Sequence, residues 1–443
     1  MAFARILKAC KWGIAASITI PAVALAQSHP EFVPLGRVSA ALYRPDSGPA
    51  PHIAFLVSHR TANNLNNIAC KELAKRGFLA LCWNTRFQNN EASVRWEDIA
   101  FDVKTTVDYV RSLPGITKVV LLGHSGGSPL MSYYEAVAEA GPNWCKGPDK
   151  LIQCTANMDF KPADGIVFPD AHPGNGVQSL RGLNPSVSVA SDGTYKVDPT
   201  LDPYNPANGF NPEGASHYSK DFQARYFAAQ SKVMNDLIAK AQAKMTLIKA
   251  GKSTWLDDDL FIIPGGGWSG AGPGSSDLIA MDPGIPELMS TARPEKLLKN
   301  DGTIVTEVVH SVAVPEPENA KANRTFERGT KVFTLKSFLS ANAVKSTNAL
   351  SGVDWCSSNN STMCAVQSIK IPTLIAAMGA FHFIRDQEQM YELSAAKDKD
   401  YIVIEGAVHG YTPCKACEKT PGQYSNSDKN LFDYIQKWAN ARF

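Results

Sequence analysis

Residues 118–130 read Lys-Val-Val-Leu-Leu-Gly-His-Ser-Gly-Gly-Ser-Pro-Leu, and they join an apolar run to a helix-like pattern. The apolar run predicts a buried β-strand over 119–122, and the pattern from 128 to 140 predicts a helix. Between them, Gly123-His-Ser-Gly-Gly127 has the Gly-x-Ser-x-Gly pattern of a sharp strand-to-helix turn, in which glycines avoid clashes and the serine hydroxyl is exposed. We therefore predict that Ser125 is a nucleophile; the alternative is a serine in an ordinary turn.

Strands and helices alternate on both sides of this turn. Strands alternating with helices indicate a parallel sheet that helices cover on both faces, so the expected fold class is α/β. The predicted strands are 38–43, 53–57, 78–83, 119–122, 163–170, 372–377 and 401–404. The predicted helices of this part are 64–76, 94–113, 128–140, 387–397 and 430–439.

The alternation is interrupted by a long segment that is loop-rich and partly helical. It begins after the strand that ends near Asp170 and includes a predicted helix at 218–251. We expect residues 172–369 to form an inserted cap or lid domain over a core made of residues 27–171 and 370–443.

The N-terminal residues resemble an export signal. Arg5, Lys8 and Lys11 precede an apolar stretch over 13–26 that is too short to span a bilayer, and it ends in the small residues Ala24-Leu-Ala26. We expect residues 1–26 to be a signal peptide and the protein to be periplasmic or secreted, without stable membrane insertion after cleavage. An uncleaved N-terminal anchor is the alternative.

The cysteine count agrees with export, because an even number of cysteines in an exported chain predicts disulfides. Eight cysteines follow the signal, and local pairing would join 70 with 82, 145 with 154, 356 with 364, and 414 with 417. The Cys414-Lys-Ala-Cys417 pair is also compatible with a redox pair or half a zinc site. It lacks a thioredoxin-like context and two further zinc ligands, so we interpret it as structural.

Charge and motifs exclude several other functions. The net charge is +2 and there is no long basic run, so neither a nucleic-acid surface nor a polybasic membrane patch is expected. No His-Glu-x-x-His or comparable metal motif occurs, and we expect no metal and no cofactor.

A general base is expected on the loop after the last strand. His409 follows the predicted strand 401–404 after a short loop, and it comes after Ser125 in the chain. We predict that His409 activates Ser125; a surface loop histidine is the alternative.

These motifs resemble the α/β-hydrolase fold family, in particular its serine esterase or lipase-like members with a large inserted cap. The resemblance covers roughly residues 36–171 and 370–443, and it is specific at the Ser125 turn and at His409. It implies a Ser–His–acid triad and an oxyanion hole of two backbone N–H groups. Gly126 would supply one donor. The other would be Arg60 or Thr61, where family members often have His-Gly.

The acid of the triad departs from the family pattern. His382 stands where the family usually has its aspartate, and a histidine cannot supply a buried negative charge. Three carboxylates remain as candidates: Asp170 after the strand that precedes the cap, and Glu388 and Asp386 beyond the usual position. Either of the last two can instead simply favour a helix N-terminus.

The expected function is hydrolysis of a carboxylic ester or lactone, a small-molecule substrate, through an acyl-enzyme. His124, His172 and His382 would line the substrate pocket, although hydrogen-bonded structural histidines are an equal alternative. Two other functions stay open: an amide or peptide hydrolase, and a non-catalytic binding protein with a decayed triad.

Overall fold

The computed structural model describes residues 29–266, 278–315 and 329–443. The predicted signal peptide, residues 1–26, lies outside the described residues.

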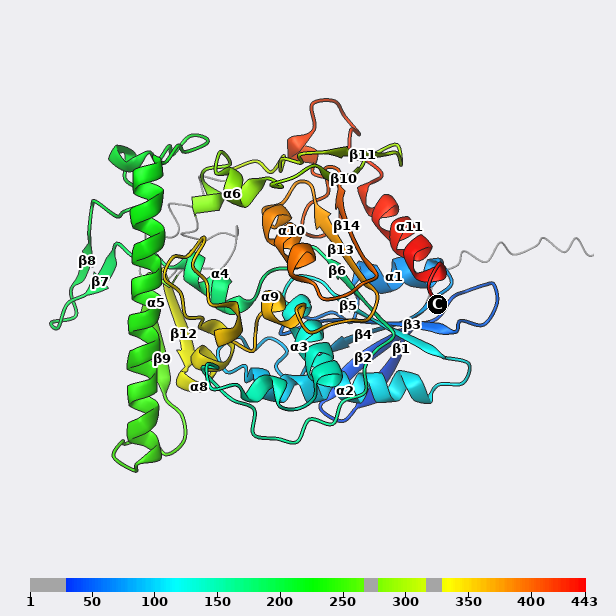
Figure 1. The fold of residues 1–443 in the computed structure, drawn as a ribbon, viewed down its shortest axis with the longest axis horizontal. Helices are drawn as coiled ribbons and strands as arrows, with labels where there is room; N and C mark the ends of the chain where they lie inside the picture. The colour runs from blue at the N-terminus through cyan, green and yellow to red at the C-terminus, as the bar shows by residue number, and fades with distance from the viewer. Residues whose placement is uncertain (1–28, 267–277, 316–328) are drawn as a thin grey trace, which may run out of the picture.

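A ten-stranded, mostly parallel sheet forms the centre of the molecule (Figure 1). Neighbouring strands from β4 to β10 are parallel, whereas β1–β2, β2–β4 and β10–β11 are antiparallel. The strands, in their order across the sheet, are β1 (Glu31–Leu35), β2 (Val38–Tyr43), β4 (Leu79–Asn84), β3 (Ile53–His59), β5 (Lys118–Gly123), β6 (Gly165–Pro169), β13 (Thr373–Met378), β14 (Lys399–Ile404), β10 (Glu295–Leu298) and β11 (Ile304–Glu307).

Helices cover both faces of this sheet, as expected. One face packs in a common hydrophobic cluster with α2, α3 and α10, and the opposite face packs with α1 and α11. Every residue of β4 and β13 is buried, which explains why all but one residue of each strand is apolar. The helices are α1 (Ile68–Lys75), α2 (Trp96–Ser112), α3 (Gly127–Ala140), α10 (Ile384–Leu393) and α11 (Ser427–Asn440).

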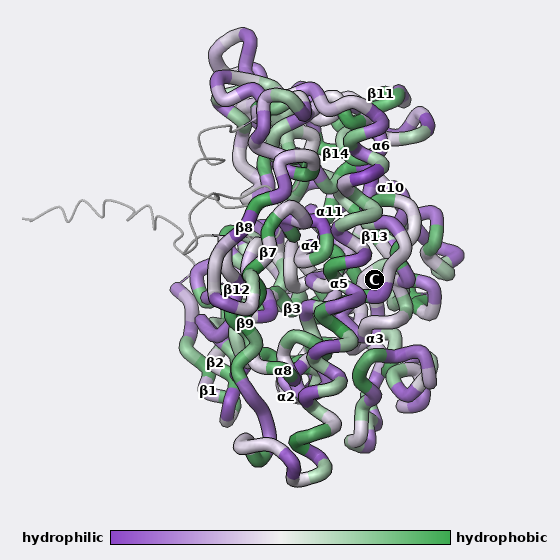
Figure 2. Tube along the Cα trace, turned by 90° about the vertical axis from the view of Figure 1, so that its left-hand side faces the viewer, coloured by the Kyte–Doolittle hydropathy of each residue, from purple (hydrophilic) through white to green (hydrophobic). Residues whose placement is uncertain are grey.

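The segment between β6 and β13 builds nearly all of a second hydrophobic cluster, to which Leu151 before β6 also belongs. Its long helix α5 (Lys220–Lys249) runs along the side of the molecule opposite to α11 (Figure 1). Figure 2, which faces α5, shows hydrophobic and hydrophilic residues mixed along it, because only one side of the helix is buried. The remaining elements of the segment are α4 (Asn175–Gly182), β7 (Val187–Val189), β8 (Tyr195–Val197), η2 (Pro206–Asn208), β9 (Leu260–Pro264), η3 (Leu278–Ala280), α6 (Pro286–Met289), β12 (Thr330–Thr334), α8 (Leu335–Ser337), η4 (Phe338–Asn342), η5 (Trp355–Ser357) and α9 (Thr362–Ala365).

Two strands of this segment were not expected in the central sheet. β10 pairs in parallel with β14 through Leu297 and Leu298, and β11 extends the edge. The segment therefore contributes to the core sheet as well as to its own cluster. The cap boundaries at 172 and 369 stay a prediction.

Four disulfides join the cysteines in the predicted local pairs: Cys70–Cys82, Cys145–Cys154, Cys356–Cys364 and Cys414–Cys417. The first ties α1 to β4, and the last lies at η6 (Lys415–Cys417), shortly after the loop that carries His409. The second bridge begins in η1 (Trp144–Lys146).

Candidate active site

Ser125 lies on the sharp turn between β5 and α3. Its φ of 52° is in the left-handed region that non-glycine residues rarely adopt. A Cβ atom at Gly123 would lie 2.8 Å from Gly127 O, and one at Gly127 would lie inside contact distance of Ser58 O. The two outer glycines of the motif are thus required by the close approach of β3, β5 and α3.

His409 is presented by a tight loop after β14. Val408 N–H donates to Thr412 O at 2.9 Å, and Tyr411 N–H donates to Val408 O at 2.8 Å, which folds residues 408–412 back on themselves. The His409 side chain is about one third exposed, and its Nδ1–H donates to Asp170 Oδ2 at 2.5 Å. The loop therefore holds the ring against a carboxylate while leaving part of it accessible.

Asp170 follows the last residue of β6 and is completely buried. Its Oδ1 accepts a hydrogen bond from Gln387 Nε2 at 2.9 Å, so both carboxylate oxygens have a partner. Burial raises the pKa of Asp170, and the neighbouring His409 and the Gln387 bond oppose that rise. Gln387 was not identified from the sequence, because only the packing of α10 brings it to Asp170.

His124 connects the Ser125 turn to the His409 loop. Its Nε2–H donates to His409 O at 2.7 Å, and the two rings lie 4.5 Å apart. Ser125 Oγ makes no hydrogen bond with any residue in the described ranges. Hydrogen bonds of a catalytic serine are often long or misaligned without substrate.

The other two candidate carboxylates have different partners. Glu388 is fully buried, accepts from Ala292 N–H at 2.7 Å and Arg293 N–H at 3.1 Å, and pairs with Arg385. Asp386 forms a buried ion pair with Arg181 of α4, at 2.7 Å.

These contacts tie α10 to the segment between β6 and β13. Among the described residues, Asp170 is the one carboxylate that contacts His409.

The predicted oxyanion region lies where β3 ends. Gly126 N–H has no hydrogen-bond partner in the described part of the chain, so it is available as a donor. Thr61 N–H, in contrast, donates to His59 Nδ1 at 3.2 Å. Arg60 directs its side chain into the region: a Cβ atom at Gly126 would lie 2.7 Å from Arg60 Nη1. The Thr61 N–H is therefore already hydrogen-bonded, and the Arg60 side chain places a positive charge next to Gly126.

The predicted pocket histidines are buried or half-buried near His409. Burial lowers the pKa of His124, His172 and His382 well below the usual value, and the neighbouring His409 adds to this in each case. His59 shares this behaviour and was missed as a site residue. Its position at the end of β3 was the signal for it, since polar residues at the carboxyl ends of parallel strands gather at one edge of a sheet.

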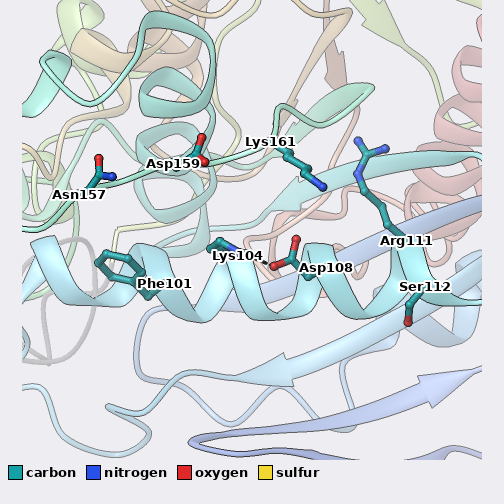
Figure 3. A pocket seen from close by; sticks show the side chains of 8 residues that line it. All are labelled: Phe101, Lys104, Asp108, Arg111, Ser112, Asn157, Asp159 and Lys161. Atoms are coloured by element: carbon teal, nitrogen blue, oxygen red, sulfur yellow. Dashed lines mark hydrogen bonds and ion pairs between the residues drawn. The ribbon is translucent and has the colours of Figure 1, made fainter.

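A separate surface hollow lies between α2 and residues 157–161 (Figure 3). Lys104, Asp108 and Arg111 line it, and none of the predicted site residues does. Within the described ranges, no group of three or more metal-ligating side chains is present. No helix in these ranges is long and apolar enough to cross a membrane.

Neither a protein-family model nor a curated protein matches the chain. Several solved structures are similar to it at very low sequence identity. The siderophore hydrolase EstB from Aspergillus fumigatus is 9% identical, with 94% of this chain and 98% of that chain covered and a TM-score of 0.44. Est1E from Butyrivibrio proteoclasticus is 8% identical, with 93% and 98% covered and a TM-score of 0.39. A proline iminopeptidase from Mycobacterium smegmatis is 11% identical, with 94% and 98% covered and a TM-score of 0.38.

Proposed function

The chain has the α/β-hydrolase fold, and on that premise we propose that it is a serine hydrolase that cleaves a carboxylic ester or lactone. The observation that carries the proposal is the His409–Asp170 hydrogen bond beside the Ser125 turn. A buried carboxylate that accepts from Nδ1–H fixes the tautomer in which Nε2 can take a proton. Ser125, His409 and Asp170 follow three different strands of the sheet, so they lie near one another at the carboxyl ends of these strands.

The reaction would proceed through an acyl-enzyme. Ser125 Oγ attacks the carbonyl carbon while His409 Nε2 removes its proton. Gly126 N–H stabilises the resulting oxyanion, together with a second donor near Arg60. The intermediate then expels the alcohol, which takes the proton from His409. Water, activated by the same histidine, releases the acid and restores the serine.

Asp170 would stabilise the imidazolium that forms in both halves of the reaction. Its burial disfavours the ionised carboxylate, and the charge on His409 offsets this cost when the ring is protonated. The Gln387 bond to Oδ1 would hold the carboxylate in the orientation that His409 needs. Glu388 and Asp386 are engaged by other groups, which favours Asp170 as the acid.

Export to the periplasm or the medium belongs to the same proposal. Four disulfides among the described residues support it, since disulfides persist in oxidising compartments.

The test combines active-site labelling with ester hydrolysis. Wild-type protein should react with a fluorophosphonate probe and hydrolyse p-nitrophenyl esters, with a preference among acyl lengths that begins to define the pocket. Ser125→Ala should lose labelling and at least about 10⁴-fold of the rate. The exposed Ser112→Ala is the matched control and should keep both.

The two alternatives give different results in this test. An amide or peptide hydrolase would also be labelled at Ser125 but would prefer p-nitroanilides over the matching esters. A binding protein with a decayed triad would show neither labelling nor hydrolysis, and that result would overturn the proposal.

A further inference from the structure

Two side chains with N–H donors lie against Gly126, next to Ser125, and a third lies beside them. His59, the last residue of β3, and Arg60, which follows it, are the two at Gly126, and His172, shortly after β6, lies next to Arg60. A Cβ atom at Gly126 would lie 2.6 Å from His59 Nε2 and 2.7 Å from Arg60 Nη1. Arg60 Nη1 in turn lies 3.5 Å from His172 Nε2.

The hydrogen bonds of His59 fix which of its ring nitrogens carries the proton. Its Nδ1 accepts from Thr61 N–H at 3.2 Å and from Ala62 N–H at 3.0 Å. Nδ1 is therefore unprotonated, and in the neutral ring the hydrogen is on Nε2. This donor faces Gly126, and no acceptor for it is present among the described residues.

The same argument holds for His172. Its Nδ1 accepts from Gly174 N–H at 3.1 Å, so its Nε2 also carries the hydrogen. Burial and the charge of Arg60 lower the pKa of both His59 and His172, which keeps the rings neutral at pH 7. A guanidinium is only a donor, so Arg60 Nη1 and His172 Nε2 face each other as two donors.

Arg60 is held in place by its other nitrogens. Nε donates to Glu91 Oε2 at 3.1 Å, Nη2 lies 3.0 Å from the same oxygen, and Nη1 donates to Asn175 Oδ1. Nη1 has two hydrogens and Asn175 takes one, so one N–H remains directed at the space near His172. The guanidinium side chain is only 13% exposed, so this donor is fixed rather than free to turn into water.

Fixed donors without an acceptor, in a site that is mostly closed to water, match a negatively charged oxygen. We propose that His59 Nε2, Arg60 Nη1 and His172 Nε2 form a side-chain binding site for an anionic oxygen beside Ser125. The proposal deepens the proposed function and rests on it for the reaction at Ser125. The oxygen is either the oxyanion of the tetrahedral intermediate or a carboxylate that the substrate itself carries.

The kinetic test compares two substrates of equal acyl length, p-nitrophenyl butyrate and the mono-p-nitrophenyl ester of succinate, which is anionic. The variants are His59→Leu, His172→Leu and Arg60→Gln, with His59→Gln and His172→Gln as conservative partners that keep an N–H near the Nε2 position. Each variant is first compared with wild type by circular dichroism and Tm. The exposed His217→Gln is the matched control and should leave the kinetics of both substrates unchanged.

The result separates the two sources of the oxygen. An oxyanion site requires kcat to fall on both substrates alike, by about 10²–10³-fold for a lost donor, with partial recovery in the Gln variants. A carboxylate site requires KM to rise on the succinate ester, by tenfold or more, with little change on the butyrate ester. Folded Leu and Arg60→Gln variants that stay within twofold of wild type on both substrates would overturn the proposal.

Two measurements that need no catalysis, ligand binding and the tautomers of the imidazole rings, test the anion site independently of the proposed hydrolase activity. On Ser125→Ala protein, calorimetry should detect succinate binding that Arg60→Gln weakens at least tenfold if the substrate supplies the carboxylate. Imidazole ¹⁵N spectra should show the Nε2–H form of His59 and His172, whichever source is correct. An Nδ1–H form at both rings contradicts the site even if Ser125 is catalytic. Loss of labelling at Ser125 with the Nε2–H forms present would contradict only the proposed function.

Discussion

The backbone N–H of Ser125 donates to the carbonyl oxygen of Asp170 at 3.3 Å. Both residues have positive φ, 52° and 47°, although neither is glycine. Such conformations cost free energy and persist only where the surroundings hold them. The two strained residues stand at the ends of the adjacent strands β5 and β6, so one backbone bond sets the predicted nucleophile and the predicted acid at a fixed separation.

Replacing Asp170 by asparagine should identify the acid. The amide keeps the size of the side chain but removes the charge that stabilises the imidazolium, and it favours the wrong tautomer of His409. We expect kcat on p-nitrophenyl butyrate to fall about 10⁴-fold in Asp170→Asn, while Tm changes little.

Glu388→Gln is the matched control for that variant. Glu388 accepts backbone N–H groups of residues 292 and 293, so its loss should lower Tm but leave kcat within a few-fold of wild type. A larger fall of kcat in Glu388→Gln than in Asp170→Asn would reverse the assignment.

Adding one methyl group at Gly127 should disrupt the fold around the Ser125 turn. The new Cβ would clash with the carbonyl oxygen of Ser58, which is backbone and cannot move aside. We expect Gly127→Ala to lower the free energy of unfolding by about 3 kcal/mol or more in urea denaturation. At Gly147, a Cβ would meet nothing closer than 3.8 Å, so a comparable loss in Gly147→Ala would show that the clash is not the cause.

The Cys70–Cys82 bridge should stabilise the protein more than the Cys414–Cys417 bridge does. Their sequence separations are 12 and 3, and the entropy removed from the unfolded chain grows with loop length. Replacing both cysteines of the first pair by alanine should cost about 3 kcal/mol, and the second pair about 2 kcal/mol. Chemical denaturation measures both; alkylation of untreated protein at any of these four cysteines would show that the bridge is not formed.

The buried Arg181–Asp386 ion pair should respond differently to single and double substitution. Asp386→Ala removes the carboxylate that pairs with the buried Arg181 guanidinium, so we expect a loss of about 3–5 kcal/mol of stability. The double variant Arg181→Met with Asp386→Leu replaces the pair by apolar groups and should be less destabilised than Asp386→Ala alone. Equal Tm values for the two variants would argue against a desolvated pair.

Stability should decrease as the pH falls below about 6.5. Burial lowers the pKa of His172 and His382, so between the ordinary value of 6.5 and their lower folded values the unfolded chain binds protons that the folded protein does not. Their contribution is therefore present above pH 6.5 and is lost below it, by about 1 kcal/mol per histidine between pH 6.5 and 5.5. His382→Leu should reduce the pH dependence of the unfolding free energy over this interval by about 1 kcal/mol, because the other buried histidines still contribute. An unchanged slope would contradict the mechanism.

The strands and helices nearest Ser125 follow from local patterns. Hydrophobic runs of the right length predicted β5 and the start of α3 to within a residue. The helix predicted at 387–397 instead spans Ile384–Leu393. It ends early because Ala395 N–H bonds to Val366 O at 2.9 Å, a tertiary contact that no local pattern contains.

The identity of the triad acid and the presence of β10 in the sheet could not be predicted from the sequence, because both depend on contacts between distant parts of the chain. Three carboxylates had suitable positions in the sequence. Only the pairing of β6 with β13, and of β13 with β14, brings one of them, Asp170, against His409. The strand β10 has two buried residues, Leu297 and Leu298, which is too short a hydrophobic run to be recognised. Its place in the sheet comes from pairing with a strand more than a hundred residues away.

That pairing also dictates when the sheet can close during synthesis. β14 occupies the gap between β13 and β10, and it follows both of them in the sequence. Until residues 399–404 have emerged, both neighbours keep an open strand edge, and open edges invite pairing with other chains. His409 follows β14 by only a few residues, so the ribosome delivers the missing strand and the proposed base almost together. A chain arrested before this point therefore lacks the base and is also prone to aggregate through these two open edges.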